Sequence, residues 1–343
     1  MTGGGEPGHP APRVVALGGG HGLAASLSAL RRVSGDLTAV VTVADNGGSS
    51  GSLRRQYGVL PPGDLRMALA ALCGDDDWGT TWSRVVQHRF GGDGGLGGHA
   101  VGNLLIVALW DLLGDTVEGL EWVGRLLGTQ GRVLPMASVP LDIVAEVEGA
   151  DPARPAEVTR VRGQHACAAT AGRVRSISLM PDDPPAVPAA VAAVSTADWV
   201  VFGPGSWFTS VLPHLLVPEL AAALRDTRAR RVVALNLAPQ PGETGGYSLH
   251  QHLEVLAGHS PGLKFDVVLA DRGAAGGNPG GGQDGDDAVA ELEKAASLLG
   301  ARLVLADVAL ADGTPRHDPL LLARAYAEMF GEGSGADGDD RRC

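Results

Sequence analysis

The stretch VVALGGGHGL, residues 14–23, joins a short apolar run to a turn in which four of the five residues 18–22 are glycine. Glycine lets the backbone turn sharply and approach a ligand without Cβ clashes. The residues from Leu23 onward are patterned as a helix, and the free N–H groups at a helix start favour an anion. The stretch therefore predicts a strand, a tight turn and a helix that together bind a phosphate group.

The spacing of these glycines fits neither common phosphate-binding motif. A Rossmann fingerprint calls for glycine or alanine at position 23, which is Leu23, and the Gly-Lys-Ser/Thr of a P-loop is absent from the sequence. Asp45, after the second apolar run, nevertheless lies where a Rossmann acid binds ribose hydroxyls. A dinucleotide therefore stays open as an alternative ligand, with an NAD-dependent dehydrogenase as the weakest of the functions considered.

Short apolar runs alternate with helical patterns along the chain. The runs are continuous, as in central strands of a parallel sheet that is covered on both faces. The alternation predicts a Rossmann-like, doubly wound α/β fold with a mostly parallel sheet, in which ligands bind beyond the carboxyl ends of the strands. The predicted strands are 13–17, 37–43, 198–203, 231–237, 265–271 and 302–308, and the predicted helices are Leu23–Val33, Pro218–Thr227, Leu249–Ala257, Ala288–Leu299 and Asp318–Phe330.

The remaining segments depart from this alternation. Residues 64–130 are patterned mostly as helices, and three alternating runs predict a small antiparallel insertion. Glycine-rich and polar composition predicts disorder at both ends and one flexible surface loop. The predicted organisation is a single domain, 13–331, with the insertion at 142–180, the flexible loop at 272–287 and disordered ends at 1–12 and 332–343.

Composition limits the class of protein. The chain has 343 residues, 44% of them hydrophobic, which is enough for a sizeable core. Its net charge of −12 argues against general nucleic-acid binding, which needs a basic surface. Three widely separated cysteines, the lack of a signal-peptide pattern and the lack of a long apolar run lead us to expect a reduced, cytoplasmic protein without a membrane span. His250 and His252 lack the spacing of a metal site, so no metal is predicted from them.

Four further loops carry polar side chains at predicted strand or helix ends. Residues 46–51 in TVADNGGSSGSLR (42–54) read as a second anion-binding loop, closed by Arg54 and Arg55. In LPPGDLR (60–66) the aspartate reads as a helix N-cap. In FGPGSWFTS (202–210) the glycines give the backbone conformational freedom, and a helix is predicted to begin at Ser206. GGLGGHAVGNLL (94–105) places His99 and Asn103 on one helix face.

Seven motifs, in this order, resemble those of the YvcK family of gluconeogenesis factors, within the wider YvcK/CofD superfamily. They are GGGHGL, TVADNGGSSGSLR, PPGDLR, GHAVGNLL, GRVLP, FGPGSWFTSVLPHLLVP and QPGETGGY, and weaker similarity continues to PRHDP at 315–319. The resemblance implies a cytoplasmic, Rossmann-like protein that binds a UDP-sugar, UDP-N-acetylglucosamine or UDP-glucose, at the strand ends. It implies a regulatory role in cell shape and envelope synthesis during growth on gluconeogenic carbon sources.

The wider superfamily supplies an alternative function. CofD-like relatives use Mg²⁺ to transfer a phospholactyl group from a nucleotide-activated donor to a deazaflavin, and Asp45 and Asp64 would then position the metal and the leaving phosphate. Asn46 stands where many members have a second aspartate, which favours the binding function. His21 stands where many have threonine, and no tyrosine occupies the segment between Asp271 and Ala288.

On the binding hypothesis the glycine loops and Ser206 hold the diphosphate, Asp45 or Asn236 meets sugar or ribose hydroxyls, and Arg316 pairs with phosphate. This hypothesis assigns no catalytic residue, metal ligand or firm cofactor. Its partner is the UDP-sugar, and a homo-oligomer and protein partners in envelope synthesis stay open. The predicted ligand-binding residues are Gly18, Gly19, Gly20, His21, Gly22, Asp45, Asn46, Gly47, Gly48, Ser49, Ser50, Asp64, Arg66, Asn103, Gly203, Pro204, Gly205, Ser206, Asn236 and Arg316.

Overall fold

One parallel sheet of seven strands organises the computed structural model, which describes residues 11–151, 153–170, 172–240, 243–244, 247–276 and 283–335. The strand order reverses at β1, so the predicted doubly wound fold is confirmed. Across the sheet the strands are β10 (Arg302–Ala306), β9 (Val267–Asp271), β8 (Arg230–Ala234), β7 (Trp199–Phe202), β1 (Arg13–Gly18), β2 (Asp36–Val41) and β3 (Arg132–Pro135).

The central strand β1 is buried after its first residue, and so is β2 beside it. Ala16 in β1 lies opposite Ala39 of β2 on one side and Val201 of β7 on the other. Such apolar runs, rich in valine and alanine, fit a strand that is covered on both faces, because neither face needs polar residues. The carboxyl ends of β1 and β7 therefore lie next to each other where the strand order reverses.

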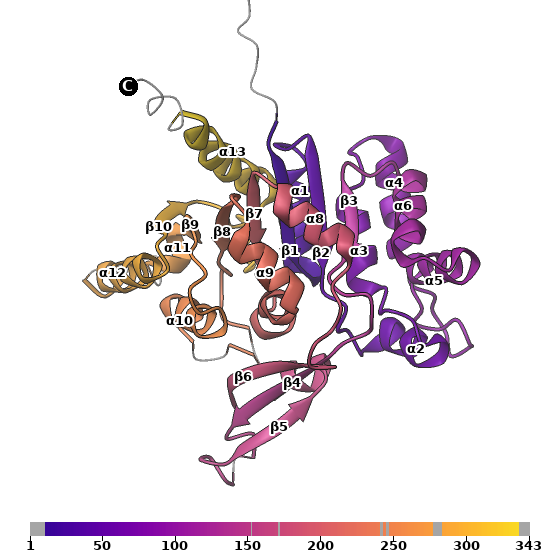
Figure 1. Cartoon of the computed structure of the whole chain (residues 1–343), viewed down its shortest axis with the longest axis horizontal. Coiled ribbons are helices and arrows are strands. Elements are labelled where there is room, and N and C mark those ends of the chain that lie inside the picture. Colours follow the sequence, from indigo (N-terminus) through magenta and orange to yellow (C-terminus); the bar gives the residue numbers. More distant parts are fainter. Residues whose placement is uncertain are drawn as a thin grey trace, which may run out of the picture.

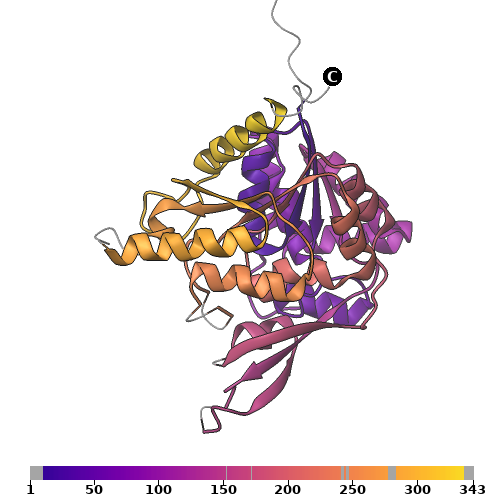
Figure 2. The same cartoon turned by 60° about the vertical axis from the view of Figure 1, so that its left-hand side comes forward.

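Helices cover both faces of the sheet (Figures 1 and 2). The connection through α1 leads from β1 to β2, and the connection through α9 leads from β7 to β8, in the opposite direction across the sheet. Right-handed crossovers that run in opposite directions place their helices on opposite faces of the sheet. The helix α1 packs against α3 and α13, and α8 packs against α9. These helices are α1 (Gly20–Leu30), α3 (Gly63–Ala71), α8 (Pro188–Thr196), α9 (Pro218–Asp226) and α13 (Pro319–Gly335).

Further helices surround the two halves of the sheet. On the side of β3, α4, α5 and α6 form the expected helical region, and on the side of β10, α10 packs against α12 (Figure 1). The remaining helical segments are α2 (Gly48–Tyr57), α4 (Asp77–Gln87), α5 (Val101–Leu113), α6 (Thr116–Leu127), η1 (Trp207–Val211), η2 (Leu212–Leu216), α10 (Leu249–His259), α11 (Arg272–Ala275) and α12 (Gln283–Leu298).

The predicted antiparallel insertion is also confirmed. Its three strands follow the order β5-β4-β6 and project away from the main sheet in both views (Figures 1 and 2). One face of β4 is buried, and the exposed strand β5 forms an edge. The insertion consists of β4 (Asp142–Glu148), β5 (Val158–Arg162), the short helix α7 (Gln164–Ala168) and β6 (Arg173–Met180).

Several predicted boundaries were wrong. The helix α1 begins at Gly20 rather than Leu23, and residues 48–51, expected as a loop, are the first turn of α2. The strand β3 was missed, because four residues ending in proline give little pattern. The loop expected at 272–287 is helical in α11 and at the start of α12, while 277–282 lie outside the described residues, as do 1–10 and 336–343.

A buried hydrogen-bond chain links the first and last helices to the sheet. The Ser26 hydroxyl in α1 lies 2.6 Å from the Tyr326 hydroxyl in α13 and donates to the Gly203 carbonyl at 3.2 Å. Both side chains are fully buried. The loop that follows β7 is therefore held by helices from opposite ends of the chain.

Among the described residues, no single helix is both long and apolar enough for a membrane span. One pair of consecutive helical segments has the required length and apolar composition when taken together, but it is bent by 79°: Trp207–Leu216 and Pro218–Asp226.

Candidate functional site

A cavity of about 660 Å³ lies at the carboxyl ends of the strands, beside the reversal of strand order between β1 and β7. Its walls come from the loops after β1, β7, β8 and β10, and the insertion adds Gln164. Ligand cavities in proteins of this fold occupy the same place and have comparable sizes. The predicted site residues that line it are Gly19, Gly20, His21, Gly22, Pro204, Gly205, Ser206, Asn236 and Arg316.

Two glycine-bearing loops touch within this cavity because they lack side chains. A Cβ on Gly22 would lie 2.2 Å from the Pro204 carbonyl oxygen and 2.4 Å from the Gly205 Cα atom. Gly20 has a φ of +58°, a left-handed conformation that glycine adopts without a steric penalty. The loops after β1 and β7 can therefore present their backbones to one ligand.

The amino terminus of α1 forms the anion-favouring wall of the cavity. The first N–H groups of a helix have no partner within it, and the helix dipole makes this end positive. The Gly20 N–H donates to the Asp64 carboxylate, and the Leu23 N–H already bonds to the Gly19 carbonyl at 3.3 Å. His21 and Gly22 lie between them and line the cavity, so their N–H groups are the ones available to a phosphate.

Asn236 shapes the opposite loop. Its Oδ1 atom accepts from the Gly205 N–H at 2.9 Å, and its Nδ2 atom donates to the Gly205 carbonyl at 2.7 Å. This pair of bonds fixes the loop after β7 and leaves one Nδ2 hydrogen of Asn236 for a ligand. The Arg316 guanidinium reaches the cavity from the loop after β10, where it is exposed and bonds to Asp312 at 2.9 Å.

A second group of predicted residues forms a buried network behind α1. The Arg66 Nε atom donates to Asn103 Oδ1 at 2.9 Å, and Asn103 Nδ2 donates to Ser49 Oγ at 3.0 Å. The Ser49 hydroxyl also lies 3.1 Å from His99 Nδ1. Burial and the charge of Arg89 lower the pKa of Arg66 to about 10, although Asp64 and Asp45 favour its charged form. Arg66 stays a cation at neutral pH.

Asp45 and Asp64 are neighbours in this network. Burial, and then the Asp45 charge, raise the pKa of Asp64 to about 7, although the Gly20 N–H and Arg66 favour its ionised form. Asp45 Oδ1 accepts from the Gly47 N–H at 2.9 Å. A Cβ on Gly19 would lie 2.5 Å from Asp64 Oδ2, so the carboxylate touches the glycine loop. The two groups of predicted residues therefore meet at the start of α1.

The predicted roles of two residues need correction. Asp64 is not the N-cap of α3, because that helix begins at Gly63 and the carboxylate accepts from α1 instead. Asn46 turns towards the insertion, where its Oδ1 accepts from the His165 N–H at 3.2 Å. Its amide therefore fastens the insertion beside the cavity.

The remaining predicted residues support these loops. Ser50 Oγ lies 2.2 Å from the position of a Gly63 Cβ, so the serine packs directly on α3. The Gly18 carbonyl accepts from Thr42, at the end of β2. Three glycines stand at element ends, namely Gly47 and Gly48 at the start of α2 and Gly203 after β7.

Sequence reasoning missed several residues that line the cavity or support it. Gln164, Ser210 and His317 line it, and the buried Glu243 bonds to Ser206. Burial lowers the pKa of His317. Glu243 stands within the QPGETGGY motif, so an acid in a family motif was the available signal.

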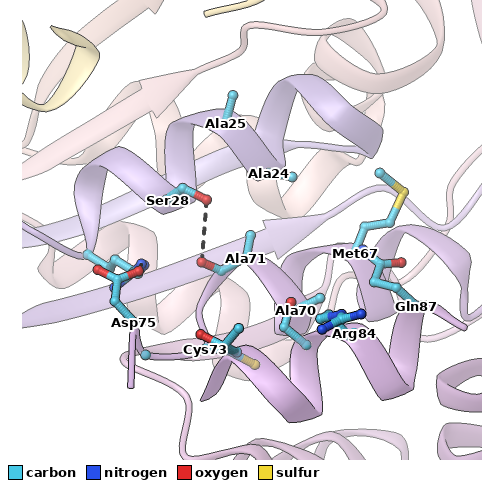
Figure 3. Close-up of a pocket in the computed structure, with 14 residues that line it drawn as sticks. Ala24, Ala25, Ser28, Met67, Ala70, Ala71, Cys73, Asp75, Arg84 and Gln87 are labelled. Carbon is cyan, nitrogen blue, oxygen red and sulfur yellow. Dashed lines mark hydrogen bonds and ion pairs between the residues drawn. The ribbon is translucent and has the colours of Figure 1, made fainter. Parts of the chain in front are cut away.

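A second cleft, of about 420 Å³, lies between α1, α3 and α4 (Figure 3). Ala24, Ala70 and Ala71 lie along it, and Ser28 donates to the Ala71 carbonyl at 3.5 Å. None of the predicted site residues lines this cleft, and among the described residues no group of three His, Cys, Asp or Glu side chains could hold a metal ion. The cavity beside β1 and β7 is therefore the candidate site.

Comparison with known proteins gives the family. The sequence pattern of the CofD family, described as 2-phospho-L-lactate transferase, matches residues 14–279. The "Putative gluconeogenesis factor" of Mycobacterium tuberculosis H37Rv is 52% identical over 310 residues, which cover 90% of this chain and 88% of the relative. The gluconeogenesis factor of Listeria monocytogenes is 39% identical over 251 residues, covering 72% and 74%.

A solved structure agrees with these sequence relatives. The crystal structure of a UPF0052 family protein from Bacillus halodurans superposes with a TM-score of 0.79 at 31% identity, covering 93% of this chain and 99% of that chain. The fold, the ordered motifs and the relatives agree with the resemblance noted from the sequence. The chain therefore belongs to the CofD family and, within it, to the gluconeogenesis factors.

Proposed function

We propose that the protein binds a UDP-sugar, UDP-N-acetylglucosamine or UDP-glucose, in the cavity beside β1 and β7, without turning it over. The observation that carries the proposal is the convergence of the α1 amino terminus with the loops after β7 and β8 on one cavity. Backbone N–H groups at a helix start suit a diphosphate. His21 and Gly22 supply them here, and Arg316 adds a cation at the rim.

The size and polarity of the cavity support this ligand class. Its volume of about 660 Å³ suits a ligand larger than a free phosphate. The protein carries a net charge of −12, so attraction of an anion depends on local donors rather than on the overall field. The α1 amino terminus and Arg316 supply such donors in the cavity.

A thermal-shift and calorimetric panel tests the proposal. UDP-N-acetylglucosamine and UDP-glucose should stabilise the protein, by about 2.7 kcal/mol at a hundredfold excess over Kd, while NAD and GTP should not. Gly20→Val should remove the effect, because a β-branched residue does not tolerate φ = +58° and would cover the first turn of α1. The absence of a shift with millimolar UDP-sugar would refute the proposal.

We further propose that the protein acts in the cytoplasm as a regulator of cell shape and envelope synthesis under gluconeogenic growth. Support comes from its membership of the gluconeogenesis factors. A deletion strain complemented with the wild-type chain should regain normal shape on a gluconeogenic carbon source, whereas Gly20→Val should not restore it. Full rescue by a variant that does not bind ligand would separate the cellular role from the site.

The Asp45–Asp64 pair favours a second candidate function, a CofD-like phospholactyl transferase. Two neighbouring carboxylates, one with a pKa raised to about 7 by burial and by the other's charge, would gain from a divalent cation. They would hold Mg²⁺, which would neutralise charge on the phosphates of a nucleotide-activated donor. Incubation with a phospholactyl nucleotide, Mg²⁺ and a deazaflavin tests this function, and product that disappears in Asp45→Asn would establish it.

A further inference from the structure

Two serines of the segment after β7 line the cavity, and their hydroxyls have different surroundings. Ser206 precedes η1, and Ser210 lies within it. The Ser206 hydroxyl donates to the carboxylate of Glu243, which also accepts from the Thr209 hydroxyl at 2.7 Å. The Ser206 and Thr209 hydroxyls also contact each other. Among the described residues, the Ser210 hydroxyl has no hydrogen-bond partner. The two side chains therefore differ in which hydrogen-bonding role they offer a ligand.

Glu243 is a buried carboxylate with its bonds satisfied by protein donors. It is 4% exposed, and its Oε2 atom accepts from the Phe208 N–H at 3.2 Å while Oε1 accepts from the two hydroxyls. A serine hydroxyl has one hydrogen and two lone pairs. The hydrogen of Ser206 is committed to Glu243 or to the Thr209 hydroxyl, so Ser206 can only accept a hydrogen bond from a molecule in the cavity.

We propose that Glu243 is a positioning residue that fixes Ser206 as a hydrogen-bond acceptor. The cavity then prefers a diphosphate that carries a sugar over a diphosphate that carries a third phosphate. Hydroxyl and N–H groups of a sugar donate to such an acceptor. The oxygens of a γ-phosphate are largely deprotonated above neutral pH and then only accept hydrogen bonds, so they would face the lone pairs of Ser206 and, behind them, the carboxylate of Glu243. The inference rests on the proposed UDP-sugar binding and names what distinguishes a UDP-sugar from a nucleoside triphosphate.

Ser210 provides the matched comparison within the same wall. Its Oγ atom lies 3.2 Å from the position that a Cβ on Gly19 would occupy, so it sits against the glycine loop. Its hydrogen is not committed within the described residues, and it can donate to a phosphate oxygen. Ser210 should therefore contribute equally to every ligand that shares the diphosphate, whereas Ser206 should distinguish between the groups attached to it.

Calorimetric titration with UDP-N-acetylglucosamine and UTP tests the inference in four proteins. The wild type should prefer the UDP-sugar, and Ser206→Ala should lower that preference about three- to tenfold, the worth of one hydrogen bond. Glu243→Gln should lower it about tenfold or more, because the amide donates to Ser206 and turns its hydrogen towards the cavity. Ser210→Ala should weaken both ligands alike and leave their ratio unchanged.

The outcomes separate this inference from the proposed function. Wild-type protein that binds neither nucleotide would overturn the UDP-sugar proposal and the inference with it. A wild type that prefers UTP, or an unchanged ratio in folded Ser206→Ala, would overturn the inference and leave nucleotide binding intact. Circular dichroism of each variant shows whether it is folded. If Glu243→Gln does not fold, the ligand preference of Ser206→Ala alone tests the inference.

Discussion

Asp64→Asn should make the folded protein more stable at high pH and change the pH dependence of its stability. In the native state, burial and the charge of Asp45 raise the pKa of Asp64 from 3.8 to about 7. The stability associated with protonated Asp64 is fully present below pH 3.8 and is lost as the pH rises through 7. Asparagine is isosteric, can still accept from the Gly20 N–H and carries no charge at any pH.

The magnitude follows from the pKa values. One pKa unit corresponds to about 1.4 kcal/mol, so ionised Asp64 costs the fold on the order of 4 kcal/mol at pH 8. About 2–3 kcal/mol of this cost develops between pH 5 and pH 8. The difference in free energy of unfolding between Asp64→Asn and the wild type should therefore grow by that amount across the range, in favour of the variant.

Urea denaturation of both proteins at pH 5, 6, 7 and 8 measures this difference. His214 has the opposite effect, because burial lowers its pKa to about 4 and its contribution is lost as the pH falls from 6.5 towards 4. Since His214 is present in both proteins, its effect cancels in the comparison. Parallel profiles for the two proteins would refute the assignment of a buried, protonated Asp64 beside Asp45.

Two further predictions concern the same end of the sheet. Binding of UDP-N-acetylglucosamine at pH 7.5 without Mg²⁺ should take up protons, because a diphosphate at the α1 amino terminus disfavours the ionised form of Asp64. Calorimetric titration in two buffers of different ionisation enthalpy measures this uptake. Proton uptake that persists in Asp64→Asn would contradict the prediction. Gly22→Ala should destabilise the fold by about 1–3 kcal/mol and abolish ligand binding, since its Cβ would meet the Pro204 carbonyl at 2.2 Å. Gly258→Ala, a helix position open to solvent, should stabilise slightly in the same denaturation assay.

The parallel sheet and its order of motifs could be predicted because both follow from local pattern. Continuous valine-rich runs identify covered strands, and glycines at their ends identify the turns that build the cavity. The strand β3 escaped because four residues with proline carry too little pattern, and its place at the sheet edge depends on distant pairing with β2. The start of α2 escaped because glycine and serine have low helix propensity, which tertiary packing overrides.

The sequence brought several of the cavity-lining residues into the predicted site, but it did not indicate their hydrogen bonds. Gly22 and Ser206, from loops about 180 residues apart in sequence, line one cavity. The partner of each side chain depends on contacts between residues far apart in sequence: Asp64 accepts from Gly20, and Ser206 donates to Glu243. No periodicity records such contacts. The wrong N-cap role for Asp64 arose because a local cap is the only partner that sequence spacing suggests.

The hydrogen-bond chain from Tyr326 through Ser26 to the Gly203 carbonyl has a consequence for how the protein is made. The glycine-rich turns near the beginning of the chain are synthesised early, but the helix that braces them emerges from the ribosome about 300 residues later. A nascent chain therefore lacks the contact between α1 and α13 through most of translation, and this contact can form only after Tyr326 has been synthesised.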